Sequence, residues 1–148
     1  NRTHQNGMAI SIQQAIFSGD TRKLQALLED FMLQSISSMD GANEGFYHGM
    51  MLGLCAVLGN RYQVRSNRES GLGRFDIQLA PLVSGIPGFL FEFKHTNDPR
   101  IDLDSLADTA LRQIDEKKYD TEMQSAGIHS IVKIGIAFRG KSAVVKRS

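Results

Sequence analysis

The sequence lacks several features, and each absence excludes a class of protein. Its 148 residues contain a single cysteine, Cys55, so no disulfide can form within the chain and nothing requires an oxidising compartment. No apolar run approaches the length of a membrane span and no signal-peptide pattern is present, so we expect a cytoplasmic protein without a membrane partner. The 17 basic and 16 acidic residues give a net charge of +1, which neither requires nor excludes a polyanionic partner.

Internal repeats, low-complexity stretches and a Walker-type phosphate loop are also absent from the sequence. The composition is 41% hydrophobic and 22% charged, which is sufficient for a hydrophobic core, and the length predicts one domain. Because the first residue is not Met, we expect the chain to be either a fragment of a longer protein or a trimmed form of one.

Two short segments alternate between apolar and polar residues, as β-strands do. In residues 74–79, one face carries Phe75, Ile77 and Leu79, and the other carries Arg74, Asp76 and Gln78. In residues 89–94, one face carries Phe89, Phe91 and Phe93, and the other carries Leu90, Glu92 and Lys94. If the two strands pair, an Asp, a Glu and a Lys meet on one face of the sheet.

That polar face has two interpretations. Two carboxylates suit a hard divalent cation, and an ammonium group beside them can hold or help to deprotonate a water molecule. Alternatively, the face is solvated, because an antiparallel sheet often has one such face and a Glu and a Lys two residues apart are ordinary there.

Periodicity and turn signals predict the remaining elements. Helices are expected over residues 8–17, from 20 or 21 to a polar stretch at 37–41, over 43–58 and over 103–125. Strands are expected over 61–65, 74–79, 89–95, 128–138 and 142–146, with a turn over 66–73. A helix between the third and fourth strands implies a crossover and at least one parallel pair. The predicted fold is a mixed α/β sheet flanked by helices.

Several motifs in this order resemble the PD-(D/E)XK nuclease superfamily, in particular the nuclease-like domain at the C-terminus of bacterial AAA-ATPase-like proteins. The motifs are residues 67–77, then 91–94, then Gln113 and Tyr119 in the helix that follows; residues 44–49 and 134–138 also match the family's pattern. The resemblance covers about residues 40–146. It implies a restriction-endonuclease-like fold over residues 41–148, preceded by an N-terminal helical segment, 1–40, that packs on or links to the core.

The resemblance also implies catalytic roles. Asp76 and Glu92 would be the main metal-binding carboxylates, with the backbone carbonyl of Phe93 as a further ligand. Mg²⁺ would be the metal ion, because it prefers oxygen ligands, and Mn²⁺ could replace it. Lys94 would orient the attacking water and offset charge on the phosphate.

Further residues have both a structural and a functional interpretation. Glu44 either complements a helix dipole or acts as an outer carboxylate for the metal, and Gln113 either contacts solvent only or contributes to the active site. Arg68 and Arg74 either pair on the surface or contact phosphate, for which guanidinium groups are well suited. The resemblance also implies that Tyr119 contacts nucleic acid, although it lies six residues after Gln113, well off the same helix face.

Neighbouring residues are expected to be structural. Lys117 and Lys118 are expected to be solvated helix residues that could also touch backbone phosphate, and His48, at i+4 from Glu44, is more simply a satisfied helix histidine than a metal ligand.

The resulting hypothesis is an Mg²⁺-dependent deoxyribonuclease that hydrolyses phosphodiester bonds by direct attack of a metal-activated water. The alternatives are a non-catalytic nucleic-acid-binding or interaction module with the same fold, and a nuclease that is silent unless joined to an N-terminal AAA-ATPase-like region. DNA is the expected partner, bound without direct reading of the bases, because no groove-reading motif is present.

Overall fold

The computed structural model describes residues 2–35, 44–69 and 73–148, without the side chains of residues 2–6, 35 and 69. Five strands form one sheet in chain order, namely β1 (Tyr62–Glu69), β2 (Arg74–Pro81), β3 (Gly88–His95), β4 (Ile131–Arg139) and β5 (Ser142–Arg147). Strands β3 and β4 are parallel, and the other neighbouring pairs are antiparallel. This mixed sheet confirms the predicted α/β class and is consistent with a restriction-endonuclease-like fold.

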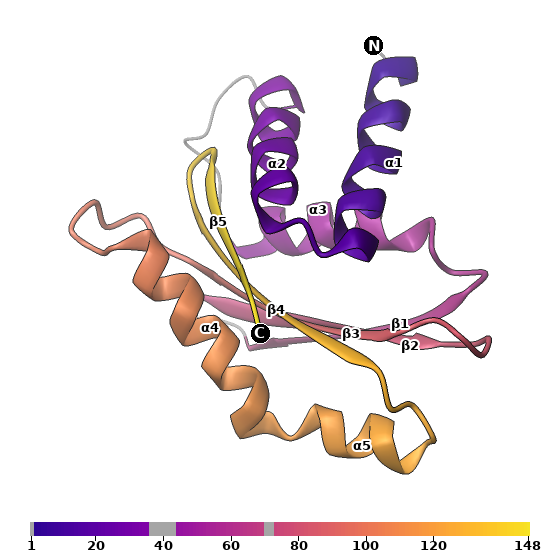
Figure 1. The fold of residues 1–148 in the computed structure, drawn as a ribbon. Helices are drawn as coiled ribbons and strands as arrows, with labels where there is room; N and C mark the ends of the chain where they lie inside the picture. Colours follow the sequence, from indigo (N-terminus) through magenta and orange to yellow (C-terminus); the bar gives the residue numbers. More distant parts are fainter. Residues whose placement is uncertain (1, 36–43, 70–72) are drawn as a thin grey trace.

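Helices cover both faces of the sheet (Figure 1). One face carries α1 (Arg2–Ser18), α2 (Thr21–Ser35) and α3 (Glu44–Ala56), and the other carries α4 (Leu103–Lys117) and α5 (Tyr119–Ser125). Helices α4 and α5 form the crossover between β3 and β4, which confirms the predicted parallel connection. Within the described ranges, no helix is long and apolar enough to cross a membrane.

The largest hydrophobic cluster lies between the sheet and the first three helices. Phe75, Phe91 and Phe93 are at most 1% exposed, and Phe93 stacks with Phe75 and Phe91 at centroid distances of 4.4 and 5.7 Å. Ile12 of α1 and Leu28 of α2 belong to the same cluster, so the first two helices share a core with the sheet. The predicted division at residue 40 lies outside the described residues and stays a prediction.

On the opposite face, α4 approaches the sheet closely because β4 contains Gly135. A Cβ atom added at Gly135 would lie 2.6 Å from the backbone oxygen of Ala107 and 2.6 Å from the backbone nitrogen of Leu111. Both neighbours belong to α4, so only glycine leaves room for the helix at this point. Since Gly135 is aligned with Glu92 of β3, the close approach holds α4 above the polar positions of the sheet.

The structure corrects two predicted elements. Residues 66–69, predicted as the start of a turn, continue β1, because their backbone pairs with residues 74–77 of β2; residues 70–72 of that turn lie outside the described residues. The helix predicted over residues 103–125 is broken at Lys118, whose φ of 57° is left-handed and ends α4. Periodicity does not reveal this break, because Lys is an ordinary helix residue.

Candidate active site

Asp76 and Glu92 lie side by side on the face of the sheet that α4 and α5 cover. The antiparallel register aligns Asp76 of β2 with Glu92 of β3, and aligned residues have their Cβ atoms about 5 Å apart. The two residues are 2% and 0% exposed. The predicted convergence of the carboxylates is therefore confirmed, but the face is covered rather than solvated. Two adjacent buried carboxylates require partners, because an uncompensated buried charge is costly.

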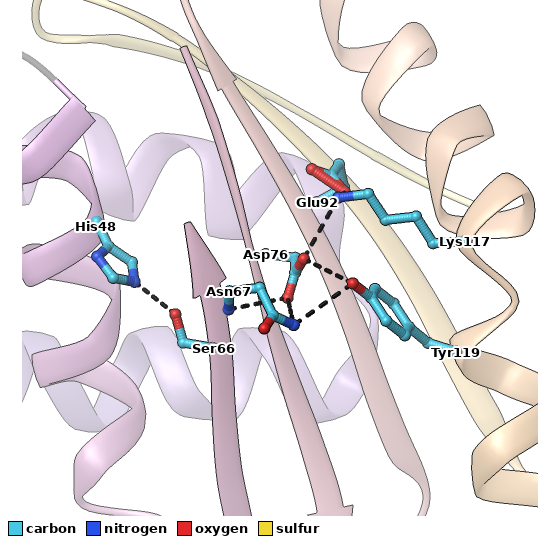
Figure 2. Close-up of polar contacts among 7 residues, drawn as sticks. All are labelled: His48, Ser66, Asn67, Asp76, Glu92, Lys117 and Tyr119. Atoms are coloured by element: carbon cyan, nitrogen blue, oxygen red, sulfur yellow. Dashed lines mark hydrogen bonds and ion pairs between the residues drawn. The ribbon is translucent and has the colours of Figure 1, made fainter. Parts of the chain in front are cut away.

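The principal partner is Lys117, the last residue of α4. Its Nζ lies 2.7 Å from Glu92 Oε1 and 3.4 Å from Asp76 Oδ2, between the two carboxylates (Figure 2). The expectation that Lys117 is a solvated helix residue was wrong. One sequence signal could have identified it. The buried positions of α4 are Leu103, Ala107, Ala110 and Ile114. Lys117 is the next position of that stripe, three residues after Ile114.

Asn67 and Tyr119 hold the Asp76 carboxylate from two other elements. Oδ1 of Asp76 accepts hydrogen bonds from the backbone and side-chain nitrogens of Asn67, both at 3.2 Å. Oδ2 accepts a hydrogen bond from the Tyr119 hydroxyl at 3.2 Å (Figure 2). The break at Lys118 starts a new helix at Tyr119, so the spacing of Gln113 and Tyr119 in a single helix no longer applies. Asn67 was missed as a contact because it was assigned to a turn.

The surroundings of this cluster shift the ionisation of its members. Burial raises the pKa of Glu92, although the hydrogen bond and charge of Lys117 act in the opposite direction. Burial also disfavours the charged form of Lys117, but the hydrogen bond to Glu92 and the two carboxylate charges outweigh it and raise the pKa of Lys117. Burial and the charge of Asp76 raise the pKa of Tyr119, so its hydroxyl remains a proton donor at neutral pH.

Lys94 and Arg74 extend the polar row toward one end of the strands. Lys94 lies two residues after Glu92 on the same face, and its charge acts to lower the pKa of Glu92. Arg74 is aligned with Lys94 and lies two residues before Asp76. Both side chains are half-buried. The structure therefore brings Asp76, Glu92, Lys94 and Arg74 together on one face.

Within the described residues, neither Glu44 nor Arg68 forms a hydrogen bond or an ion pair with Asp76 or Glu92. Glu44 starts α3, on the opposite side of the sheet, and its Oε2 lies 3.8 Å from Nε of Arg68. Arg68 is aligned with Phe75, so it shares the face of that core residue. His48 also lies on this side and bonds the hydroxyl of Ser66 through Nε2, as Figure 2 shows. The helix histidine thus has a structural partner, and the metal role of Glu44 stays a prediction.

A family model describing the PD-(D/E)XK nuclease superfamily matches residues 42–148. The chain belongs to this superfamily. No curated protein matches the chain significantly. Membership supports a nuclease-type hydrolase that interacts with nucleic acid, and PD-(D/E)XK nucleases generally use divalent metals. The match does not bear on the AAA-ATPase context, which stays a prediction.

The residues of the pair suit the divalent metal that the superfamily implies. Oε2 of Glu92 is buried without a hydrogen-bond partner among the described residues, and so is Oε1 of Gln113, which lies in α4 one turn before Lys117. Carboxylate and amide oxygens are hard ligands of the kind that Mg²⁺ prefers. Within the described ranges, no group of three His, Cys, Asp or Glu side chains could hold a metal ion, so a site here depends on the two carboxylates and on neutral oxygens. The side chain of Phe93 has no donor atom and packs in the core, so only its backbone carbonyl could contribute a ligand.

A polar cleft adjoins the Asp76 and Glu92 pair on the side of edge strand β1. Its volume is about 560 Å³, and it is lined by Arg65, Ser66, Asn67, Gln78, Tyr119 and Glu122. Asn67 and Tyr119 contact Asp76 directly, so the cleft leads to the pair. Arg65 is aligned with Gln78 and thus lies on the site face, unlike Arg68. Sequence reasoning overlooked Arg65 because strand pairing decides which residues of β1 face the cleft.

Proposed function

We propose that this protein is an Mg²⁺-dependent deoxyribonuclease that hydrolyses phosphodiester bonds by direct attack of water. The observation that carries the proposal is the aligned, buried pair of Asp76 and Glu92 with Lys94 two residues further along the same face. Membership of a nuclease superfamily favours this use of the pair over a purely structural ion pair. Mn²⁺ is expected to replace Mg²⁺, because both prefer oxygen ligands.

Asp76 and Glu92 would hold the divalent cation, which supplies a lowered water pKa and a polarised phosphodiester. Asn67 and Tyr119 fix the orientation of the Asp76 carboxylate through hydrogen bonds to both of its oxygens. Lys94 orients the attacking water and offsets the negative charge on the phosphate. The oxygen of water bonds to phosphorus and releases a proton to solvent, while the bond from phosphorus to the leaving oxygen breaks and that oxygen takes up a proton. The reaction needs no covalent intermediate with the protein.

The substrate strand would enter by the cleft beside β1. Arg65 lines the cleft and Arg74 lies on the face of the carboxylates, and guanidinium groups bind phosphate oxygens in pairs of hydrogen bonds. The net charge of +1 suggests that binding depends on these local contacts and weakens steeply as salt rises.

The test is cleavage of single-stranded, duplex and branched DNA in the presence of Mg²⁺, Mn²⁺ or EDTA. Two variants, Asp76→Asn and Lys94→Ala, should lose activity while circular dichroism shows an intact fold. Lys133→Ala is the matched control, because Lys133 is another partly buried lysine on the same face of the sheet but pairs with Asp115 and Asp120 instead.

Cleavage that requires the metal and is lost only in the two site variants supports the proposal. Wild-type cleavage by both site variants would refute it. If metal binds but no DNA is cut, the non-catalytic module or the need for an AAA-ATPase-like region becomes the better explanation.

A further inference from the structure

Lys117 occupies the position of a cation between the two carboxylates. Its Nζ is within 2.7 Å of Glu92 Oε1 and 3.4 Å of Asp76 Oδ2, and both carboxylates are almost completely buried. An ion held by both carboxylates would bind oxygen at about 2.1 Å, so it would require the space that the ammonium group fills. Two cations in one buried gap also repel each other, since burial reduces screening.

We propose that Lys117 is a built-in counter-ion that competes with the divalent metal and must leave the pair when the metal binds. This inference rests on the proposed function, because it takes Asp76 and Glu92 as the metal ligands. Without metal, Lys117 compensates the two buried charges; with metal, the ion takes over that task. The affinity for metal is then set partly by the cost of displacing the lysine.

The surroundings of Lys117 allow such a displacement. It is the last residue of α4, directly before the left-handed Lys118, and its side chain is 18% exposed. The stem of a lysine has several rotatable bonds, so the ammonium group can move without the helix. Its Nζ already lies 5.9 Å from the ring centroid of Tyr119, which offers a cation–π contact outside the pair.

In the alternative arrangement, the metal binds Glu92 without displacing Lys117. Oε2 of Glu92 is buried without a hydrogen-bond partner among the described residues, while Oε1 receives Lys117. A metal that bound Oε2 alone would leave the lysine in place. The two arrangements differ in the position of Nζ after metal binding and in the effect of removing the ammonium charge.

The experiment measures Mn²⁺ binding by calorimetry to the 148-residue protein and to three variants. Lys117→Met keeps the aliphatic stem and removes the charge. Lys133→Met is the matched control, because Lys133 also bridges two carboxylates, at 2.6 and 3.1 Å, but these are more exposed. Asp76→Asn removes one proposed ligand and reports whether the metal binds at this pair.

We expect the Kd for Mn²⁺ to fall about tenfold or more in Lys117→Met, because the competing state is removed. It should change less than about twofold in Lys133→Met, where only a more exposed charge is lost. In EDTA, Lys117→Met should melt at a lower temperature than the wild type, because the carboxylates lose their counter-ion, and Mn²⁺ should raise its melting temperature by more than it raises that of the wild type.

Unchanged or weaker binding by Lys117→Met, with binding lost in Asp76→Asn, would overturn the competition but leave the metal site standing. A crystal structure with Mn²⁺ in which Nζ still bonds Glu92 Oε1 would overturn it equally. If Asp76→Asn binds as the wild type does, or if neither the wild type nor any variant binds, both the competition and the proposed metal site are wrong.

Discussion

Helix α4 packs tightly against the sheet at Gly135, and the substitution Gly135→Ala tests how strongly that contact supports the fold. The added Cβ would meet backbone atoms of Ala107 and Leu111 at 2.6 Å, whereas ordinary contacts begin near 3.4 Å. Helix and strand would have to separate by about 1 Å, and overpacking of this kind costs about 1–3 kcal/mol. We expect Gly135→Ala to lower the free energy of unfolding by about 3 kcal/mol, the upper end of this range, because the atoms that the new Cβ meets belong to the backbone and cannot move aside by a side-chain rotation.

The assay is equilibrium unfolding in urea together with thermal melting. For a domain of this size, a loss of about 3 kcal/mol lowers the melting temperature by about 9 °C. The matched control is Gly53→Ala in α3, where an added Cβ meets nothing within 4 Å. That variant should gain about 1 kcal/mol, because alanine is the better helix former. A Gly135→Ala protein as stable as the wild type would refute the account of the helix–sheet contact.

Three further predictions follow from burial and strand register. Phe91→Ala should lower the free energy of unfolding by about 3–5 kcal/mol, because Phe91 is 1% exposed in the central strand; urea unfolding measures this. Burial raises the pKa of the Cys55 thiol to about 12, so at pH 8 a thiol reagent should modify it only after unfolding. Arg65→Gln should weaken DNA binding and reduce its salt dependence, whereas Arg68→Gln should do so less, as fluorescence anisotropy at several salt concentrations would reveal.

Each of these three predictions has a contradicting result. The burial of Phe91 is contradicted if Phe91→Ala is as stable as the wild type. The burial of Cys55 is contradicted if the native thiol reacts as fast as it does in the unfolded chain. The assignment of Arg65 to the site face is contradicted if Arg68→Gln weakens DNA binding as much as Arg65→Gln does.

The carboxylate pair could be predicted because it depends on alternation within strands. Because side chains alternate along a strand, Asp76 and Glu92 lie on the face opposite to the apolar residues of their own strands, independently of the rest of the chain. The sequence predicts that they converge on one face if the strands pair, and the antiparallel register of the structure aligns them directly. The parallel β3–β4 pair was predictable for a similar reason, since a helix between two strands requires a crossover.

The partners of the pair depend on contacts that alternation does not encode. Asn67 and Arg65 face the site because of how β1 pairs with β2, in a segment whose polar composition favoured a turn. The same register puts Arg68 on the other face, next to Glu44. A shift of one residue in this register would exchange the two sets.

The sequence by itself determined the order of the elements, the apolar face of each central strand and the two carboxylates that meet on the polar face, because these follow from local periodicity. The tertiary structure alone decided what covers that face. Close packing over Gly135 directs the buried stripe of α4 onto the sheet, and the left-handed Lys118 turns Tyr119 toward Asp76. Lys117, the last residue of α4, reaches the pair because of that packing, since the position of a helix on a sheet is set by long-range contacts.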